Sequence, residues 1–325
     1  MPDPLSTTAE FTAERREVVT TPGGLVLTVH RPASGAARGS VLLIPGWSGP
    51  RSGPADLLAW LAQRIAATGW TAVRMDLPGR GDSRGNFADV DLDDMIESAR
   101  GVAALFQSAG PGFLLGVCSG GNVALGASSV RNPPSSHAEA QRRGEHLEMK
   151  SETASADSAS LRENHPQSAL RNGVIALSVL PFQPARSNEF EHRRRWKNLK
   201  NYASKALSPA TWSRLLHGEI NLGRVRKNVT TSETSVAGDR NLKDSARDIE
   251  RELLEWQGPA LFVWGGGDEE APPARAHFEK LHAAGMGSRE HTVFHTVGGA
   301  NHNFYAQAWR EELCKLILAF LAENH

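Results

Sequence analysis

Short apolar runs alternate with segments of helical spacing along most of the chain. The runs lie between glycines, prolines and polar turns, and they predict strands in 16–21, 25–32, 40–47, 70–83, 112–117, 172–180, 258–268 and 290–298, the fourth ending in a glycine-rich loop. Apolar residues at helical spacing predict helices over 55–68, 89–110, 120–130, 273–284 and 303–323. Strands joined by helical crossovers predict an α/β protein with a mostly parallel, eight-stranded sheet that is buried on both faces.

Two stretches interrupt this alternation. Residues 131–171 are rich in Ser, Glu, Arg, Asn and Pro, which predicts a disordered insert. Residues 182–250 are charged and largely helical in pattern, with a minority of apolar positions, and they predict an inserted helical cap over the carboxyl edge of the sheet. The core would then consist of residues 1–181 and 251–325.

Composition and charge exclude several classes of partner. The 325 residues include 36 basic and 36 acidic side chains, so no overall field would attract nucleic acid or an anionic membrane. We find neither an export signal nor an apolar run of about 18 residues, and we expect a cytoplasmic protein without membrane insertion. The two cysteines, Cys118 and Cys314, have no disulfide or metal-ligand spacing. The oligomeric state stays open.

The stretch GVCSGGN, residues 116–122, has the pattern of a nucleophile elbow, a sharp turn from a strand into a helix. Residues two before and two after the attacking residue must be nearly free of side chain, because the strand and the helix press together there. Centring the turn on Cys118 places Gly116 and Gly120 at those positions, whereas centring it on Ser119 places Val117 at the first. Cys118 is therefore the predicted nucleophile, and the alternative is a small buried cysteine in a tight turn.

A thiol nucleophile needs a base that is itself oriented by a carboxylate, in the chain order nucleophile, acid, histidine. Asp268 follows the predicted strand 258–268 in a glycine-rich loop, and His302 follows the last predicted strand. Both positions lie at strand ends, so Asp268 and His302 are the predicted partners of Cys118.

Other residues compete for these roles. Glu269 could replace Asp268, because it lies one position further along the same loop. His295 lies within the last predicted strand, and His277 and His282 lie on a predicted helix, so each of these is expected to be structural. Cys314 lies among apolar residues on the last predicted helix and is expected to be packed in the core.

An oxyanion hole is expected from two backbone N–H groups. The amide of Ser119 follows the nucleophile, and the loop PGWSGP offers Gly46 and Trp47, of which Trp47 is the expected donor. The loop DLPGRGDS, residues 76–83, lacks the spacing of a dinucleotide-binding motif and is expected to shape the mouth of the site. We expect neither a cofactor nor a metal.

Together the motifs PGWSG, DLPGRGDS, GVCSGG, GGGD and ANHNF resemble those of the α/β-hydrolase superfamily over nearly the whole chain except 131–171. The cysteine in the elbow is similar to that of the dienelactone hydrolases, whose triad is Cys, Asp and His. The segment 202–222 resembles part of the exosortase-associated hydrolases of bacterial surface-polysaccharide systems. The resemblance implies an α/β-hydrolase fold with a helical cap.

The expected function is hydrolysis of an ester, thioester or lactone in a small acyl substrate, through an acyl-enzyme on Cys118. Acyl transfer by the same triad is an alternative, and so is a binding module that keeps the fold without catalysis. The basic cluster HRRRWK, residues 192–197, could bind an anionic substrate group or could be a solvated face. The substrate itself is not specified by these motifs.

Overall fold

The structure is a computed structural model that describes residues 15–106, 110–129, 172–182, 245 and 247–325. The chain divides into two compact units, of which one comprises Met1–Pro181 with Ser245–His325 and the other Phe182–Asp244. The predicted insert, 131–171, lies outside the described residues, and so does nearly all of the predicted cap, including the basic cluster 192–197. The fold below is that of the first unit.

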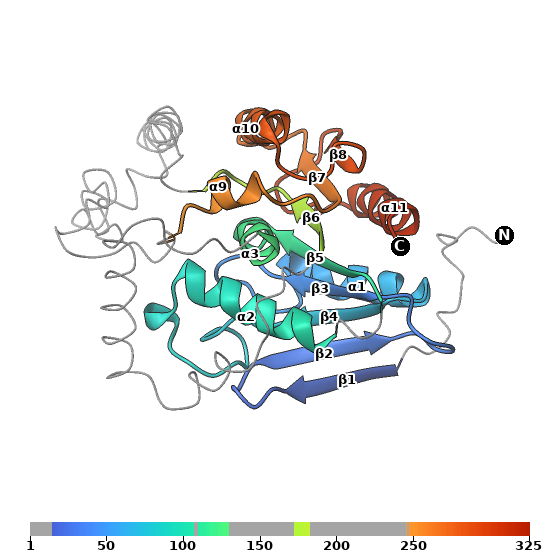
Figure 1. Cartoon of the computed structure of the whole chain (residues 1–325). Helices are drawn as coiled ribbons and strands as arrows, with labels where there is room; N and C mark the ends of the chain where they lie inside the picture. The colour runs from blue at the N-terminus through green and yellow to red at the C-terminus, as the bar shows by residue number, and fades with distance from the viewer. Residues whose placement is uncertain (1–14, 107–109, 130–171, 183–244, 246) are drawn as a thin grey trace, which may run out of the picture. The chain divides into compact units, whose positions relative to one another are not determined.

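An eight-stranded, mostly parallel sheet forms the centre of this unit (Figure 1). Its strands are β1 (Arg15–Thr20), β2 (Val26–Arg31), β3 (Ser40–Ile44), β4 (Thr71–Met75), β5 (Gly112–Val117), β6 (Gly173–Leu177), β7 (Ala260–Gly265) and β8 (Thr292–Val297). Their order is β1-β2-β4-β3-β5-β6-β7-β8. β2 is antiparallel to β1 and β4, and all other neighbours are parallel. The predicted sheet is confirmed.

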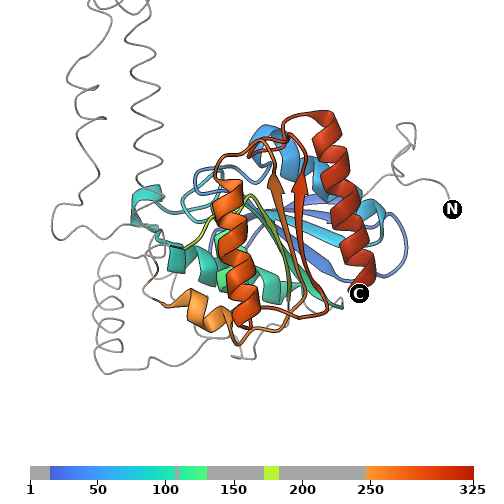
Figure 2. The same ribbon diagram turned by 90° about the horizontal axis from the view of Figure 1, so that it is seen from above.

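Helices cover both faces of the sheet (Figures 1 and 2). They are α1 (Leu57–Ala67), α2 (Leu92–Leu105), α3 (Ser119–Ser128), α9 (Ile249–Leu253), α10 (Ala271–Ala284) and α11 (Gln307–Glu323), with short 3-10 turns η1 (Pro54–Asp56) and η2 (Phe87–Asp89). α1 and α11 pack on one face, α2, α3 and α10 lie on the other, and α9 packs against α3. Among the described helices, none is both long and apolar enough to cross a membrane.

Burial is complete in the middle of the sheet and is lost at its edges. Every residue of β3, β4, β6 and β7 is buried, as their mainly apolar sequences predict. All six residues of β1 are exposed, and β8 is only partly buried. The expectation of a sheet buried on both faces is therefore wrong for β1, which is an edge strand paired to β2.

The first turn of the last helix differs from the sequence prediction. α11 begins at Gln307 rather than near Asn303. The side-chain oxygen of Asn301 accepts the N–H groups of Asn303 and Tyr305, which holds these residues in a turn instead. Phe304, within this turn, has a positive φ of 51° and is buried. This local hydrogen bonding keeps His302 in a loop.

Because six neighbouring strands are parallel, their carboxyl ends lie at one edge of the sheet. The loop after β3, the turn after β5 and the loops after β7 and β8 meet there. These are the segments that carry Trp47, Cys118, Asp268 and His302.

Candidate active site

Cys118 is the residue at which β5 turns into α3. Its φ is 55° and its ψ is −125°, a backbone state that side-chain-bearing residues rarely adopt. Its N–H donates to the Leu177 carbonyl at 2.8 Å, and its own carbonyl accepts the Gly121 N–H at 2.9 Å. The strained residue is thus fixed from β6 on one side and from α3 on the other, and its side chain remains partly exposed.

Two glycines make this turn possible. A Cβ added to Gly116 would lie 2.0 Å from the Gly120 carbonyl oxygen, and one added to Gly120 would lie 2.4 Å from the Ile44 carbonyl oxygen. Both obstacles are backbone atoms, which cannot move aside as a side chain can. The elbow frame predicted around Cys118 therefore corresponds to real close contacts between β5, α3 and the end of β3.

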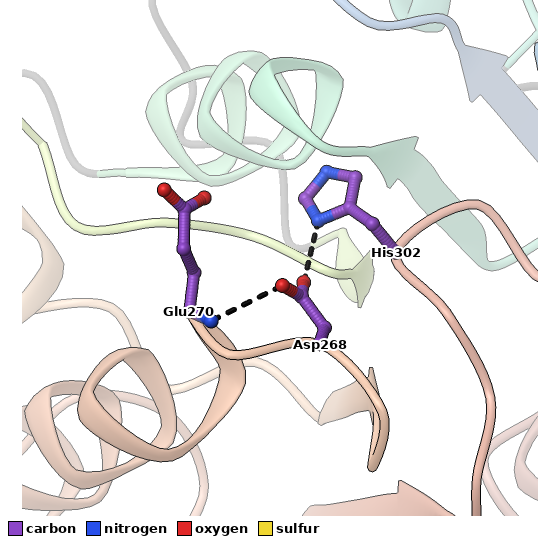
Figure 3. A group of neighbouring side chains, drawn as sticks. All are labelled: Asp268, Glu270 and His302. Atoms are coloured by element: carbon purple, nitrogen blue, oxygen red, sulfur yellow. Dashed lines mark hydrogen bonds and ion pairs between the residues drawn. The ribbon is translucent and has the colours of Figure 1, made fainter. Parts of the chain in front are cut away.

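Asp268 and His302 meet at the same edge of the sheet (Figure 3). The His302 Nδ1 atom lies 2.6 Å from Asp268 Oδ2, and the other carboxylate oxygen accepts the Glu270 N–H at 3.1 Å. The Asp268 side chain is 11% exposed and that of His302 is 27% exposed. With Nδ1 bonded to Asp268, the second ring nitrogen remains for Cys118, with which the His302 side chain is also hydrogen-bonded.

The charges in this group oppose the effect of burial on the thiol. Burial alone would raise the pKa of Cys118, but hydrogen bonding to His302, the charge of His302 and hydrogen bonds from Ser119 lower it below its usual value. The hydrogen bond to Asp268 is the main cause that raises the pKa of His302 to about 10, and the hydrogen bond to Cys118 adds to it. A thiolate beside an imidazolium is the charge state that this geometry favours.

The loop after β3 lies against the elbow. The Trp47 N–H, the expected oxyanion donor, donates to the Ser119 side-chain oxygen at 2.6 Å. Ser119 is the first residue of α3, so its own backbone N–H is at the helix N-terminus, where amides lack intrahelical partners. Both predicted donors therefore lie beside Cys118.

Arg80, in the loop after β4, holds the Trp47 loop in place. Its Nε donates to the Trp47 carbonyl and its Nη1 to the Pro78 carbonyl, each at 2.6 Å. The guanidinium lies over the rings of Trp47 and Phe87, and the Arg80 side chain is buried. Burial lowers the pKa of Arg80. The predicted mouth loop thus places a buried positive charge behind the Trp47 peptide.

Ser178 holds the loop that carries His302, as Arg80 holds the loop that carries Trp47. This role was not predicted from the sequence. Ser178 follows β6 with a φ of 47°, and its hydroxyl donates to the His302 carbonyl at 2.8 Å. It is fully buried. Sequence carries little sign of this contact, because the two residues are 124 positions apart.

The competing residues lie elsewhere or bond to other groups. Glu269 is exposed, and the carboxylate bonded to His302 is that of Asp268.

Three other histidines each have a different partner. His295 pairs with Glu312 at 3.5 Å, and His277 pairs with Glu250 at 2.9 Å. His282 contacts the Met286 carbonyl at 2.7 Å. Cys314 is buried on α11, and burial raises its pKa to about 12, as expected for a packed thiol.

Glu270 adds a second carboxylate near the histidine, as Figure 3 shows. Asp268, Glu270 and His302 each offer one atom that could bind a metal ion, and these atoms lie within 4.8 Å of one another. A metal bound there would compete with the hydrogen bond that already joins Asp268 to His302. The group is therefore first of all a carboxylate and histidine pair, with Glu270 beside it.

Comparisons with known proteins agree with this architecture. Residues 41–316 match the sequence model of the alpha/beta hydrolase family. Esterase 2 of Thermogutta terrifontis has a similar structure, with 15% identity, a TM-score of 0.55 and coverage of 98% of this chain and 97% of that one. Est1E of Butyrivibrio proteoclasticus has 15% identity, a TM-score of 0.52 and coverage of 95% and 98%.

A dienelactone hydrolase of Anabaena variabilis is similar as well, with 12% identity, a TM-score of 0.51 and coverage of 96% of this chain and 98% of that one. At these identities the likeness concerns the fold. No protein with a curated description matches the sequence at a significant level.

Proposed function

We propose that this chain, which belongs to the alpha/beta hydrolase family and is an enzyme of the hydrolase class, cleaves an ester, thioester or lactone through an acyl-enzyme on Cys118. The observation that carries the proposal is the connected series of side chains from Cys118 through His302 to Asp268. Each of the three follows a different strand, and they converge at the carboxyl edge of the sheet. The cysteine in the elbow, like that of the dienelactone hydrolases, supports a thiol nucleophile.

In the first half of the reaction, the Cys118 sulfur attacks the carbonyl carbon of the substrate. A carbon–sulfur bond forms, and the π electrons of the carbonyl pass to its oxygen, beside the N–H groups of Trp47 and Ser119. The carbonyl then re-forms as the bond to the leaving group breaks, and protonated His302 gives its proton to that group. Asp268 keeps the imidazole oriented and stabilises its positive charge.

In the second half, water attacks the thioester carbon. His302 takes a proton from this water, the second oxyanion forms at the same donors, and the carbon–sulfur bond breaks to regenerate the thiolate. The acid product leaves, and His302 is again protonated. If a sugar or amine replaced the water, the same residues would transfer the acyl group, so product analysis with and without such an acceptor distinguishes hydrolysis from transfer.

The binding-module alternative requires Cys118 to lie beyond hydrogen-bond reach of His302. The hydrogen bond between these side chains, together with the strained backbone of Cys118, favours catalysis instead. Strain of this kind costs about 1–3 kcal/mol per residue and persists where surrounding contacts enforce it.

The test combines a substrate panel with a search for the covalent intermediate. Wild-type protein is assayed with p-nitrophenyl esters, acyl thioesters and lactones, and intact mass spectrometry of the quenched reaction looks for an acyl group on Cys118. Cys118→Ala is expected to lose the adduct and to lower turnover by about 10³-fold or more. Cys314→Ala is the matched control, and its thiol lies in the core, so the adduct should persist. An adduct that survives in Cys118→Ala would refute the proposal.

A further inference from the structure

The hydroxyl of Ser119 lies between the loop after β3 and the sulfur of Cys118. Its oxygen accepts the Trp47 N–H at 2.6 Å, and the Ser119 side chain is also hydrogen-bonded to the Cys118 side chain. A Cβ added at Gly46 would lie 3.7 Å from Cys118 Cβ and 3.9 Å from the Ser119 hydroxyl oxygen. The loop therefore packs directly on the elbow, with Ser119 at the contact.

The direction of these hydrogen bonds follows from the groups involved. A backbone N–H can only donate, so the Ser119 oxygen uses a lone pair to accept from Trp47. A hydroxyl has a single hydrogen, and with its oxygen accepting from Trp47 that hydrogen remains available for the Cys118 sulfur. In the free enzyme, Trp47 thus donates to Ser119 and Ser119 donates to the thiolate.

This arrangement has a consequence for the oxyanion hole. The Trp47 N–H, which is expected to donate to the substrate oxygen, already donates to the Ser119 hydroxyl oxygen. The substrate oxygen must therefore replace the Ser119 oxygen as the acceptor of that N–H. During attack the negative charge moves from sulfur to the substrate oxygen, and the thiolate no longer needs its donor. Both changes act on Ser119 in the same step.

We infer that the Ser119 hydroxyl is a catalytic residue that exchanges partners as Cys118 is acylated, an inference that rests on the proposed role of Cys118. Before attack, the hydroxyl donates to the sulfur and accepts from Trp47. As the carbon–sulfur bond forms and the carbonyl electrons move to oxygen, the hydroxyl donates to that oxygen, which also takes the Trp47 N–H. The hydrogen stays on Ser119 throughout, so no proton is gained or lost there.

The exchange gives the Ser119 hydroxyl two tasks. In the free enzyme the hydroxyl lowers the pKa of Cys118 together with His302 and the backbone N–H of Ser119. Its oxygen also accepts the partly buried backbone N–H of Trp47 before substrate arrives. A hydroxyl at this position therefore prepares the site for attack and then stabilises the product of attack.

The experiment compares two side chains of nearly equal shape, Ser119→Thr and Ser119→Val, with Ser119→Ala as a third variant. Two quantities are measured, namely the pH dependence of Cys118 alkylation by iodoacetamide and the rate of the p-nitrophenol burst from p-nitrophenyl acetate. Ser119→Val and Ser119→Ala are expected to shift the alkylation inflection to higher pH and to slow the burst by about 10- to 100-fold. Ser119→Thr, which keeps a hydroxyl, should recover most of both.

Thermal unfolding of the three variants separates these effects from loss of structure, because Thr and Val place the same branched shape at the start of α3. Equal inflections and equal burst rates for Ser119→Thr and Ser119→Val would overturn the inference. The proposed function has its own control, since a burst that persists in Cys118→Ala would refute that function whatever the Ser119 variants do. The two failures are therefore distinguishable.

Discussion

At the scale of single residues, the ionisation of Cys118 and His302 defines the pH range in which the site can work. The pKa of His302 is raised to about 10, so its stabilising charge is fully present below the unfolded value of about 6.5 and is lost as pH rises through about 10. The pKa of Cys118 is lowered, so its thiolate contributes above the usual pKa and is lost as pH falls through the lowered one. Between these limits both groups carry charge.

We therefore expect Cys118 to react with iodoacetamide at unusually low pH. The inflection of the alkylation rate should lie below 9.0, the ordinary value for a thiol, because His302 and Ser119 outweigh the effect of burial. In His302→Ala the inflection should move upward, because burial then meets less opposition. Equal inflections in wild-type protein and His302→Ala would show that the imidazole does not influence the thiol. Cys314, buried with a pKa near 12, should contribute little signal.

At the scale of secondary-structure elements, the elbow depends on the contact between β5 and α3. Gly116→Ala is expected to disrupt it, because the added Cβ would lie 2.0 Å from the Gly120 carbonyl oxygen. The free energy of unfolding should fall by about 3 kcal/mol or more, whereas typical single substitutions lower it by about 0.5–3 kcal/mol. Urea unfolding monitored by circular dichroism measures this loss.

Gly101→Ala, at a half-buried position of α2, is the matched control. No atom lies within 4 Å of the added Cβ, and alanine favours a helix over glycine by about 1 kcal/mol, so this variant should be slightly more stable than wild type. If Gly116→Ala unfolded at the same urea concentration as Gly101→Ala, the close packing of the elbow would be refuted.

Local patterns explain how much of the site could be predicted from sequence. The elbow, the Asp268 loop and the His302 loop each follow an apolar strand. Because parallel strands bring their carboxyl ends together, the positions of these three segments could be predicted from the sequence. The roles of Arg80 and Ser178 could not be predicted in this way. Each side chain donates to a backbone carbonyl of a residue far away in the sequence. Any residue can offer a carbonyl, so the sequence of the partner gives no signal.

At the scale of the whole molecule, a buried ion pair anchors the chain where the described part resumes after residue 244. Arg247 donates to the Glu252 carboxylate with Nε at 3.1 Å and with Nη2, and both side chains contact the Ser129 hydroxyl at the end of α3. Arg100 of α2 donates to the Ser129 carbonyl at 2.8 Å. Segments far apart in the sequence therefore meet around one serine, on the face of the sheet that α2 and α3 cover.

Removal of one member of this pair should destabilise the core more than removal of both. Arg247 and Glu252 are 8% and 5% exposed, so Arg247→Met leaves a buried carboxylate without its partner, at a cost of about 3–5 kcal/mol. Arg247→Met with Glu252→Met should recover much of this loss, because no unpaired charge remains. Arg31→Met is the control, since its ion pair with Glu17 is exposed and should contribute little. Equal urea midpoints for Arg247→Met and Arg31→Met would show that the buried pair does not anchor this segment.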